Sequence, residues 1–391
     1  MKIVVIGFGQ CGCNIADQFF AINNHAKSTF GRRIEILTDA FAINTDEADL
    51  GGFEHIPIDR HHRIVIGGVR TFGHGVGKMN VDAAKIIKES HTVITDNVLD
   101  SKKFHECDAI LAIASGGGGT GSGSIGWTIK KLKERVEKPV YGVVVLPFGY
   151  EENGLTSYAV TNTATCLRTV SQYADAVFVL DNERFARRDN SLSRNLSQIN
   201  NEFVNNFYDL FCAGEEKRQR YLGSKVMDAG DIKQSLEGIS TIGRGQIDLT
   251  AFYRRNKEHF RQGAKESSTV AGALDKAMNN LSVAIDLQDA RRILILLTAP
   301  KGTITLNALE EVATLLQERA PKAVVRIGDY PRRAKEVCLT LVASGLARIA
   351  RVENLYLQAT KLLKKQAELE QETRGQVQQL QQTGDRLPTL D

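Results

Sequence analysis

A nine-residue segment, Ser-Gly-Gly-Gly-Gly-Thr-Gly-Ser-Gly at 115–123, constrains the fold of this chain more than any other feature. It follows a segment at 108–114, apolar from Ala109 onward, that predicts a buried strand, and it precedes a stretch from Ser124 that predicts a helix. Glycine loses more backbone entropy on folding than other residues, so six glycines within 116–123 need a physical reason. Backbone N–H groups that surround an anion at a helix N-terminus supply that reason. We therefore expect this loop to hold phosphate groups, with the hydroxyl groups of Thr120 and Ser122 as further donors.

Two other glycine clusters strengthen the expectation of a phosphate site. The first, Gly-Phe-Gly-Gln-Cys-Gly at 7–12, lies directly between a predicted strand at 2–6 and a predicted helix. By itself it also fits a dinucleotide-binding turn, for which Asp39 would be the ribose-binding acid. The second, at 73–78, is expected near the terminal phosphate, although Met79 stands where the P-loop motif requires Ser or Thr. Two phosphate loops on successive parallel strands fit a nucleoside triphosphate better than a dinucleotide.

The order of apolar segments predicts an α/β protein. Short strands, including 34–37, 140–146 and 176–180, alternate with helical segments in the first 180 residues, as in a parallel sheet covered on both faces. One long helix is predicted at 192–221, and a smaller α/β region follows it. A Gln-rich stretch at 353–382 predicts a C-terminal helix with a sparse apolar stripe, either a partner-binding coiled coil or a solvated helix.

Composition excludes several classes of protein. A net charge of +4 over 391 residues, with 42% hydrophobic residues, argues against a disordered chain and against a dedicated nucleic-acid binder. No apolar run reaches the roughly 18 residues of a transmembrane helix. The six cysteines form no CxxC pair, which predicts reduced thiols and a cytoplasmic location. The loop histidines are expected to be solvated rather than metal-binding, because no accompanying pattern of carboxylates is visible; they are His55, His61, His62 and His74.

Several motifs together resemble the tubulin/FtsZ family. Gly-Gly-Gly-Thr-Gly-Ser-Gly at 117–123 matches the signature of that family, and Gly-Gln-Cys-Gly at 9–12 is similar to its tubulin form. The other segments that resemble the family are Asn44-Thr45-Asp46, 146–151, Asp228-Ala229-Gly230-Asp231-Ile232 and 239–243. Together with the segments 73–77 and 211–215, they look most similar to CetZ, the archaeal branch. The resemblance covers residues 1–345 and leaves out the tail.

The resemblance implies a GTPase that assembles head to tail into cytoskeletal filaments for cell shape or division. It implies GTP or GDP and Mg²⁺ as cofactors, a second copy of the chain as partner, and an adaptor or regulator, at a membrane for example, that binds the tail. The implied units are a GTP-binding domain at 1–199, a central helix at 200–222, a second α/β domain with an acidic loop at 223–345, and a helical tail at 346–391.

The resemblance also assigns site residues. Asp228 and Asp231 would act on the attacking water in the neighbouring subunit, whereas no side chain would ligate Mg²⁺ directly and Gln10 would lie near it. Asn182 would read the guanine. Leu196 would pack on the base or simply in the core, and Asn200, or Asn201 if the helix register shifts by one, would bond its edge. The full set of expected nucleotide-binding residues is Gly9, Gln10, Cys11, Gly12, Cys13, Asn14, Asn44, Gly75, Gly77, Gly117, Gly118, Gly119, Thr120, Gly121, Glu151, Asn182, Leu196 and Asn200.

The chain departs from the family pattern at three positions. Leu155 replaces an arginine common in FtsZ, Glu152 replaces a glycine after Glu151, and Leu196 replaces an aromatic residue. The exchange at Glu152 leaves open which of the two glutamates faces the nucleotide. Two alternatives also stay open: a nucleotide-binding structural filament with negligible turnover, and an oxidoreductase that uses the loop at 7–12 with Asp39.

Overall fold

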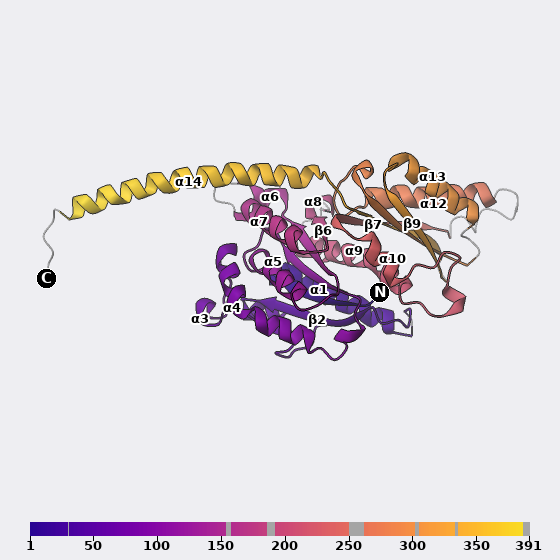
Figure 1. The fold of residues 1–391 in the computed structure, drawn as a ribbon, viewed down its shortest axis with the longest axis horizontal. Coiled ribbons are helices and arrows are strands. Elements are labelled where there is room, and N and C mark those ends of the chain that lie inside the picture. Colours follow the sequence, from indigo (N-terminus) through magenta and orange to yellow (C-terminus); the bar gives the residue numbers. More distant parts are fainter. Residues whose placement is uncertain are drawn as a thin grey trace.

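The computed structural model describes residues 1–29, 31–153, 158–185, 192–249, 262–301, 305–332 and 335–385. They form a ten-stranded sheet in the order β3-β2-β1-β4-β5-β6-β7-β10-β8-β9 (Figure 1). The six strands from β1 to β6 are parallel to one another, β7 continues them in parallel, and β10 pairs antiparallel with both β7 and β8. The strands are β1 (Ile3–Phe8), β2 (Leu37–Asn44), β3 (Arg63–Val65), β4 (Ala109–Ser115), β5 (Val140–Leu146), β6 (Ala176–Asp181), β7 (Gly238–Asp248), β8 (Arg292–Ala299), β9 (Val324–Pro331) and β10 (Glu336–Ser344).

Helices cover both faces of this sheet, so its strands are apolar on both sides. In β1, for example, Val4, Ile6 and Phe8 pack into one core and the alternate side chains pack into the other. One core is shared with α1, α9 and α10, and the other with α4, α5, α7, α12, α13 and the start of α14. The helices are α1 (Gly9–Lys27), α2 (Glu47–Gly51), α3 (Gly68–Thr71), α4 (Asn80–Leu99), α5 (Thr120–Lys133), α6 (Gly149–Glu152), α7 (Tyr158–Tyr173), α8 (Asn182–Phe185), α9 (Leu192–Ala213), α10 (Ala229–Ser235), α12 (Gln262–Asn279), α13 (Leu306–Arg319) and α14 (Ala350–Gly384).

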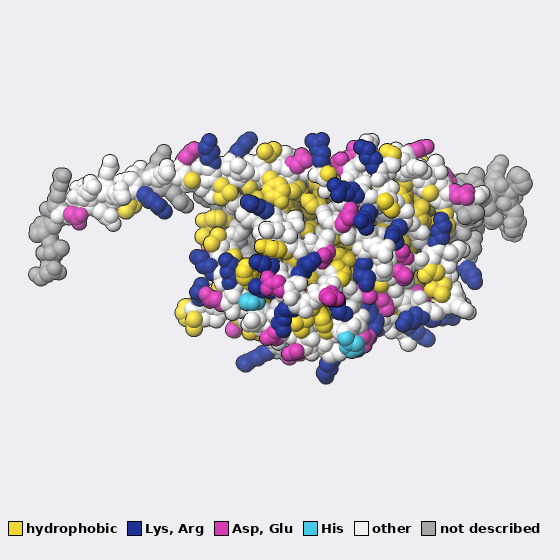
Figure 2. Space-filling view, in the orientation of Figure 1, with side chains coloured by type: hydrophobic (Ala, Val, Ile, Leu, Met, Phe, Trp, Pro, Cys, Tyr) yellow, Lys and Arg dark blue, Asp and Glu magenta, His cyan; other side chains and the backbone are white. Residues whose placement is uncertain are grey.

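The predicted C-terminal helix is confirmed and projects from the body of the molecule (Figure 1). Its 35 residues span roughly 50 Å at 1.5 Å per residue. Leu355 and Ala359 are buried against the body, whereas Leu369, Val377 and Leu380 further along are exposed. Basic and acidic side chains are interspersed over the face drawn in Figure 2.

The second strand and the central helix differ from their predicted bounds. The second strand is β2, which begins only at Leu37, because the side-chain oxygen of Asn23 accepts from the N–H groups of Ile36 and Leu37 at 3.0 and 3.1 Å. The central helix α9 begins at Leu192 and ends at Ala213. The apolar pattern predicted a helix at 192–221, and the family resemblance implied a central helix at 200–222. Beyond Ala213, the Glu216 carboxylate accepts from the backbone N–H of Arg218 at 2.9 Å and fixes a turn instead of further helix.

Glu216 gives the fold an acid-sensitive contact. Its carboxylate is buried and lies 2.6 Å from Arg332 Nη2 and 2.8 Å from Arg218 Nε. Although burial opposes ionisation, the hydrogen bonds from these arginines hold the pKa of Glu216 at about 2, below its ordinary 4.5. Since the folded chain has the lower pKa, the unfolded chain binds more protons between these values.

We expect the stabilisation from Glu216 to be complete above pH 4.5 and to disappear as the pH falls towards 2. Melting temperatures between pH 6 and pH 3 should therefore fall less steeply in the Glu216→Gln variant than in the parent chain. Equal slopes for the two proteins would contradict the assigned pKa.

Candidate functional site

The carboxyl edge of the parallel sheet brings together most of the predicted site residues. Strands β1, β2, β4, β5 and β6 all end at this edge, where the ligand site of an open α/β sheet lies. A predicted site segment lies at the end of each of these strands: Gly9, Asn44 (the last residue of β2), 116–119, 147–151 and Asn182. Residues 73–78 reach the same edge after β3.

The two glycine loops that follow β1 and β4 lie against each other. A Cβ atom added to Gly9 would lie 3.0 Å from Gly121 N, and one added to Gly121 would lie 2.7 Å from Phe8 O. Gly9 also has a φ of +66°, a conformation that costs other residues energy. The segment after β2 joins them, because the hydroxyl oxygen of Thr45 lies 2.8 Å from that of Thr120. The two loops therefore belong to one site.

Helices α1 and α5 present their N-termini at this edge without side-chain caps. The N-cap residues, Phe8 and Gly119, accept no capping hydrogen bond through a side chain, and neither helix has an acidic residue in its first turn. In contrast, α2 and α10 are capped by Asp46 and Asp228. The first N–H groups of α1 and α5 thus form a positive end suited to an anion.

The third glycine cluster packs onto the second. A Cβ atom at Gly119 would lie 2.6 Å from Val76 Cγ2, so only glycine fits there. Asn162 of α7 donates through Nδ2 to Lys78 O at 2.8 Å and to Gly118 O at 3.1 Å, which ties the two loops together. Residues 73–78, including Gly75 and Gly77, therefore lie beside the loop at 116–119. Asn162 was not predicted as a site residue, because it lies between Thr161 and Thr163 and belongs to no local motif.

The first turn of α1 divides into an exposed side and a buried side. Gln10 and Asn14 are exposed and Cys11 is half-buried. Cys13, which we expected at the ligand, is fully buried, and its Sγ atom lies 3.3 Å from Gly7 O and 3.5 Å from Ile43 O. The side chain of Cys13 therefore packs the core and does not reach the edge. Burial also raises the pKa of the Cys11 thiol to about 12, so that thiol stays neutral.

The residues predicted to recognise the base lie immediately after β6 and on α9. Asn182 is the first residue after β6 and is buried. Leu196 and Asn200 lie four residues apart on α9 and so share one helix face. Asn200 is buried and Leu196 is partly buried. Asn44 has a local role in addition, because its Nδ2 atom donates to Asp49 Oδ2 at 2.9 Å and its Oδ1 atom accepts from Thr45 N at 2.8 Å.

The two adjacent glutamates have different partners. Glu151 accepts from Phe148 N at 3.0 Å within α6. Glu152 forms an ion pair with Arg351 of α14, with Oε2 3.0 Å from Nη1, and Arg351 also donates to Pro147 O at 3.1 Å. The C-terminal helix thus begins with a clamp on the loop after β5. Leu155, another departure from the family pattern, lies outside the described residues.

The acidic residues lie at the opposite edge of the sheet. Asp228 and Asp231 cap α10 reciprocally: Asp228 Oδ1 accepts from Asp231 N at 2.8 Å, and Asp231 Oδ2 accepts from Asp228 N at 3.2 Å. Asp231 Oδ1 also lies 2.5 Å from Arg326 Nη1.

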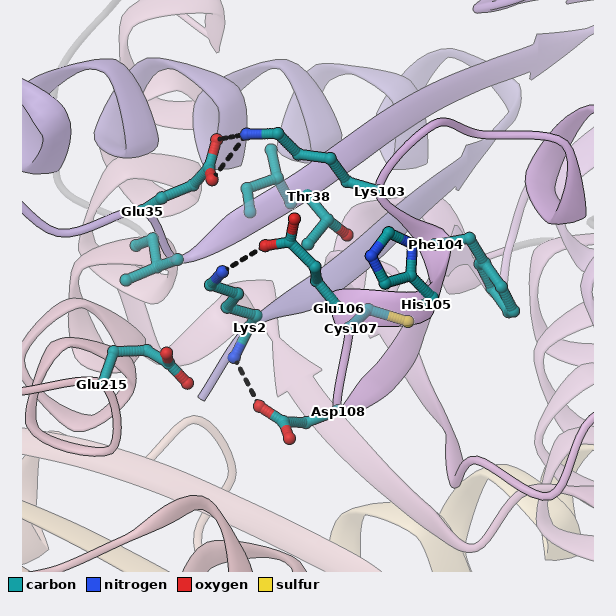
Figure 3. A network of polar contacts seen from close by, with 12 residues as sticks. Lys2, Glu35, Thr38, Lys103, Phe104, His105, Glu106, Cys107, Asp108 and Glu215 are labelled. Carbon is teal, nitrogen blue, oxygen red and sulfur yellow. Dashed lines mark hydrogen bonds and ion pairs between the residues drawn. The ribbon is translucent and has the colours of Figure 1, made fainter.

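Contacts with the amino ends of the strands fix this position of α10. Lys233 of α10 lies 3.9 Å from Asp108, the residue immediately before β4. Figure 3 shows Asp108 at this edge, where it accepts from the backbone N–H of Lys2, beside the Lys2–Glu106 ion pair. The seven residues of β4 separate this edge from the glycine loops by about 20 Å.

Asp39 does not fit the dinucleotide interpretation. It lies early in β2 rather than at the carboxyl edge, and its carboxylate accepts from Ser101 Oγ and contacts His62. An oxidoreductase with the loop at 7–12 would lack the ribose-binding acid that this fold requires.

This edge, where two glycine-led helix N-termini lack side-chain caps, has the arrangement by which nucleotide-binding α/β proteins accommodate phosphates. Residues 2–189 match the model of the Tubulin/FtsZ family, GTPase domain, and residues 189–361 match the Tubulin-like CetZ, C-terminal domain. Tubulin-like protein CetZ1 of Haloferax volcanii is 30% identical over 373 residues, which cover 91% of each chain. The chain belongs to the tubulin/FtsZ family, in its CetZ group, and its first part is the GTPase domain of that family.

Solved structures agree with this assignment. The GDP-bound monomer of CetZ1 from Haloferax volcanii superposes with a TM-score of 0.78 at 30% identity, over 92% of this chain and 99% of that one. The GTPγS-bound protofilament of CetZ2 from the same organism gives 0.79 at 26% identity, over 94% and 100%.

Across the described part of the chain, the helices are each too short or too polar to cross a membrane.

Proposed function

We propose that this chain is a cytoskeletal GTPase whose active site is completed between subunits of a head-to-tail filament. The observation that supports this most strongly is the separation of the two halves of the site. The glycine loops lie at the carboxyl edge of the sheet, whereas Asp228 and Asp231 lie about 20 Å away at the amino edge. Stacking a second copy along the strand direction brings its acidic helix onto the first copy's loops, and this contact repeats without closing.

GTP or GDP is the proposed ligand, because relatives are described with GDP and with GTPγS. The N–H groups at the starts of α1 and α5 hold the phosphates, Glu151 contacts the ribose, and Asn182 and Asn200 recognise the guanine. In this proposal, α9 joins the GTP-binding residues 1–199 to the second α/β domain at 223–345. Mg²⁺ accompanies the nucleotide near Gln10 and neutralises phosphate charge. The exposed amide of Gln10 suits a position near the ion, since Mg²⁺ usually keeps several bound waters that such an amide can bond.

A concentration series tests shared catalysis. We expect GTP turnover per molecule to rise with protein concentration through the assembly threshold, because isolated subunits lack one half of the site. Phosphate release and pelleting are measured on the same samples. A rate per molecule that stays constant across the threshold would contradict the proposal. Filaments with no phosphate release would favour the alternative of a structural filament with negligible turnover.

The biological role proposed here is the control of cell shape or division from the cytoplasm. The projecting part of α14, beyond its buried residues Leu355 and Ala359, is proposed to bind a membrane adaptor or regulator. We expect truncation after Lys361 to leave assembly and turnover in vitro within about twofold, while it changes where filaments lie in cells. An assembly defect in the purified truncated protein would instead give the tail a role within the filament.

A further inference from the structure

Asp39, His61 and His62 form a cluster outside the nucleotide edge that no step of the GTPase uses. Each offers one ligand atom, and these atoms all lie within 4.8 Å of one another. Asp39 Oδ1 and His62 Nε2 are 3.1 Å apart. Topology produces the cluster, since the two histidines immediately precede β3, which pairs with β2, the strand that carries Asp39. We propose that these three side chains bind a divalent transition-metal ion, with Zn²⁺ the best match.

A second layer of hydrogen bonds orients two of the ligands. Asp59 places both carboxylate oxygens 2.8 Å from His62 Nδ1, which directs the Nε2 atom towards the cluster. Ser101 Oγ donates to Asp39 Oδ2 at 2.5 Å, and the backbone N–H of Ala40 donates to Asp39 Oδ1 at 2.9 Å, which orients Oδ1 and leaves its second lone pair for the ion. Metal-binding histidines usually donate their second ring nitrogen to such a carboxylate. The bond from Asp59 to His62 Nδ1, three residues apart in the sequence, is a carboxylate partner that the expectation of solvated loop histidines did not include.

The loop that carries the histidines is held in place before any ion binds. Asp59 Oδ1 accepts from the backbone N–H groups of His61 and His62 at 2.9 and 2.8 Å. Asn97 Nδ2 of α4 donates to His61 O at 3.1 Å, and the Phe41 ring stacks on the His62 ring at 5.7 Å. The His61 ring itself forms no hydrogen bond with any residue that the structure describes. Its imidazole is therefore oriented by packing alone and has ring nitrogens available to an ion.

The donor set determines the class of ion. Two imidazoles and one carboxylate suit Zn²⁺ and similar first-row ions, with water completing the coordination. Mg²⁺ and Ca²⁺ prefer sites made only of oxygen ligands. The cluster lies roughly 17 Å along β2 from Asn44 at the carboxyl edge, so it is separate from the Mg²⁺ of the nucleotide. All three ligands are partly exposed, which leaves a path for entry.

His61→Gln is the decisive variant, because the ring it removes forms no hydrogen bond with the described residues and the metal-free fold should survive. Asp39→Asn keeps the shape of the second ligand and removes its charge. His55→Gln is the matched control, since His55 lies in the preceding loop outside the cluster. Each full-length protein is stripped with a chelator, and its metal-free melting temperature is compared with that of the parent chain.

Zn²⁺ binding is then measured by calorimetry and by metal content after dialysis, and Co²⁺ binding by visible absorption. We expect about one Zn²⁺ per parent chain and a Zn²⁺-dependent rise in melting temperature. Affinity should fall at least about tenfold in His61→Gln and Asp39→Asn, and should be unchanged in His55→Gln. The proposal is overturned if the parent chain takes up no Zn²⁺, or if His61→Gln binds it as tightly as the parent.

Discussion

The Asp231→Asn variant is expected to lose about 10²–10³-fold in GTP turnover while its nucleotide affinity stays within about twofold. The asparagine side chain can still accept from Asp228 N and maintain the start of α10, but it no longer carries the negative charge that would act on the attacking water. Nucleotide affinity should survive because Asp231 lies at the opposite edge of the sheet from the glycine loops. Phosphate release above the assembly threshold and equilibrium binding of a fluorescent GTP analogue measure the two quantities separately.

Arg326→Gln is the matched control for this variant. It removes the same ion pair, in which Arg326 Nη1 lies 2.5 Å from Asp231 Oδ1, but it leaves the carboxylate in place. We expect it to retain most of the turnover. Wild-type turnover in Asp231→Asn would refute the role of the acid, and equal losses in both variants would show that the ion pair itself matters.

The Gly121→Ala variant is expected to lose nucleotide affinity by at least about 100-fold. The added methyl group would lie 2.7 Å from Phe8 O and 3.2 Å from Ala114 Cβ. The two glycine loops must therefore move apart, and their N–H groups no longer point towards one anion. Overpacking of this kind costs about 1–3 kcal/mol of stability, which melting temperatures will record. Gly51→Ala is the control, because nothing lies within 4 Å of a Cβ at that position. A folded Gly121→Ala chain with normal affinity would mean that this contact does not form the phosphate site.

The local sequence was sufficient to predict the glycine loops at the carboxyl edge of the sheet. Several glycines at 116–123 are required because an added Cβ atom would lie within 3 Å of a neighbouring segment. The resulting excess of glycine is visible in the local sequence without any knowledge of long-range contacts. Buried strands and the C-terminal helix likewise follow from short apolar patterns. The position of Asp228 and Asp231 at the amino edge was not predicted from the residues, because it depends on where α9 and α10 pack against the sheet.

Features that depend on distant residues could not be predicted in this way. The clamp of Arg351 on Glu152 joins positions 199 residues apart, and Asn162 reaches Lys78 across 84. The start of β2 was misplaced because Asn23, a side chain on α1, holds Ile36 and Leu37. Cys13 was assigned to the ligand because its motif lies in the loop, but helix geometry turns every third or fourth side chain of α1 into the core. The cluster of Asp39, His61 and His62 was not predicted because Asp39 becomes a neighbour of the two histidines only when β3 pairs with β2.

Mixing two inactive variants tests the central claim most directly. Gly121→Ala keeps the acidic helix and loses the nucleotide, whereas Asp231→Asn keeps the nucleotide and loses the acid. If each active site combines the loops of one subunit with α10 of the next, an equal mixture forms intact sites at about a quarter of its head-to-tail contacts and recovers GTP turnover. Pelleting verifies that both variants enter the same filaments. A mixture that co-assembles but hydrolyses no more GTP than the two variants do alone would contradict a site shared between subunits.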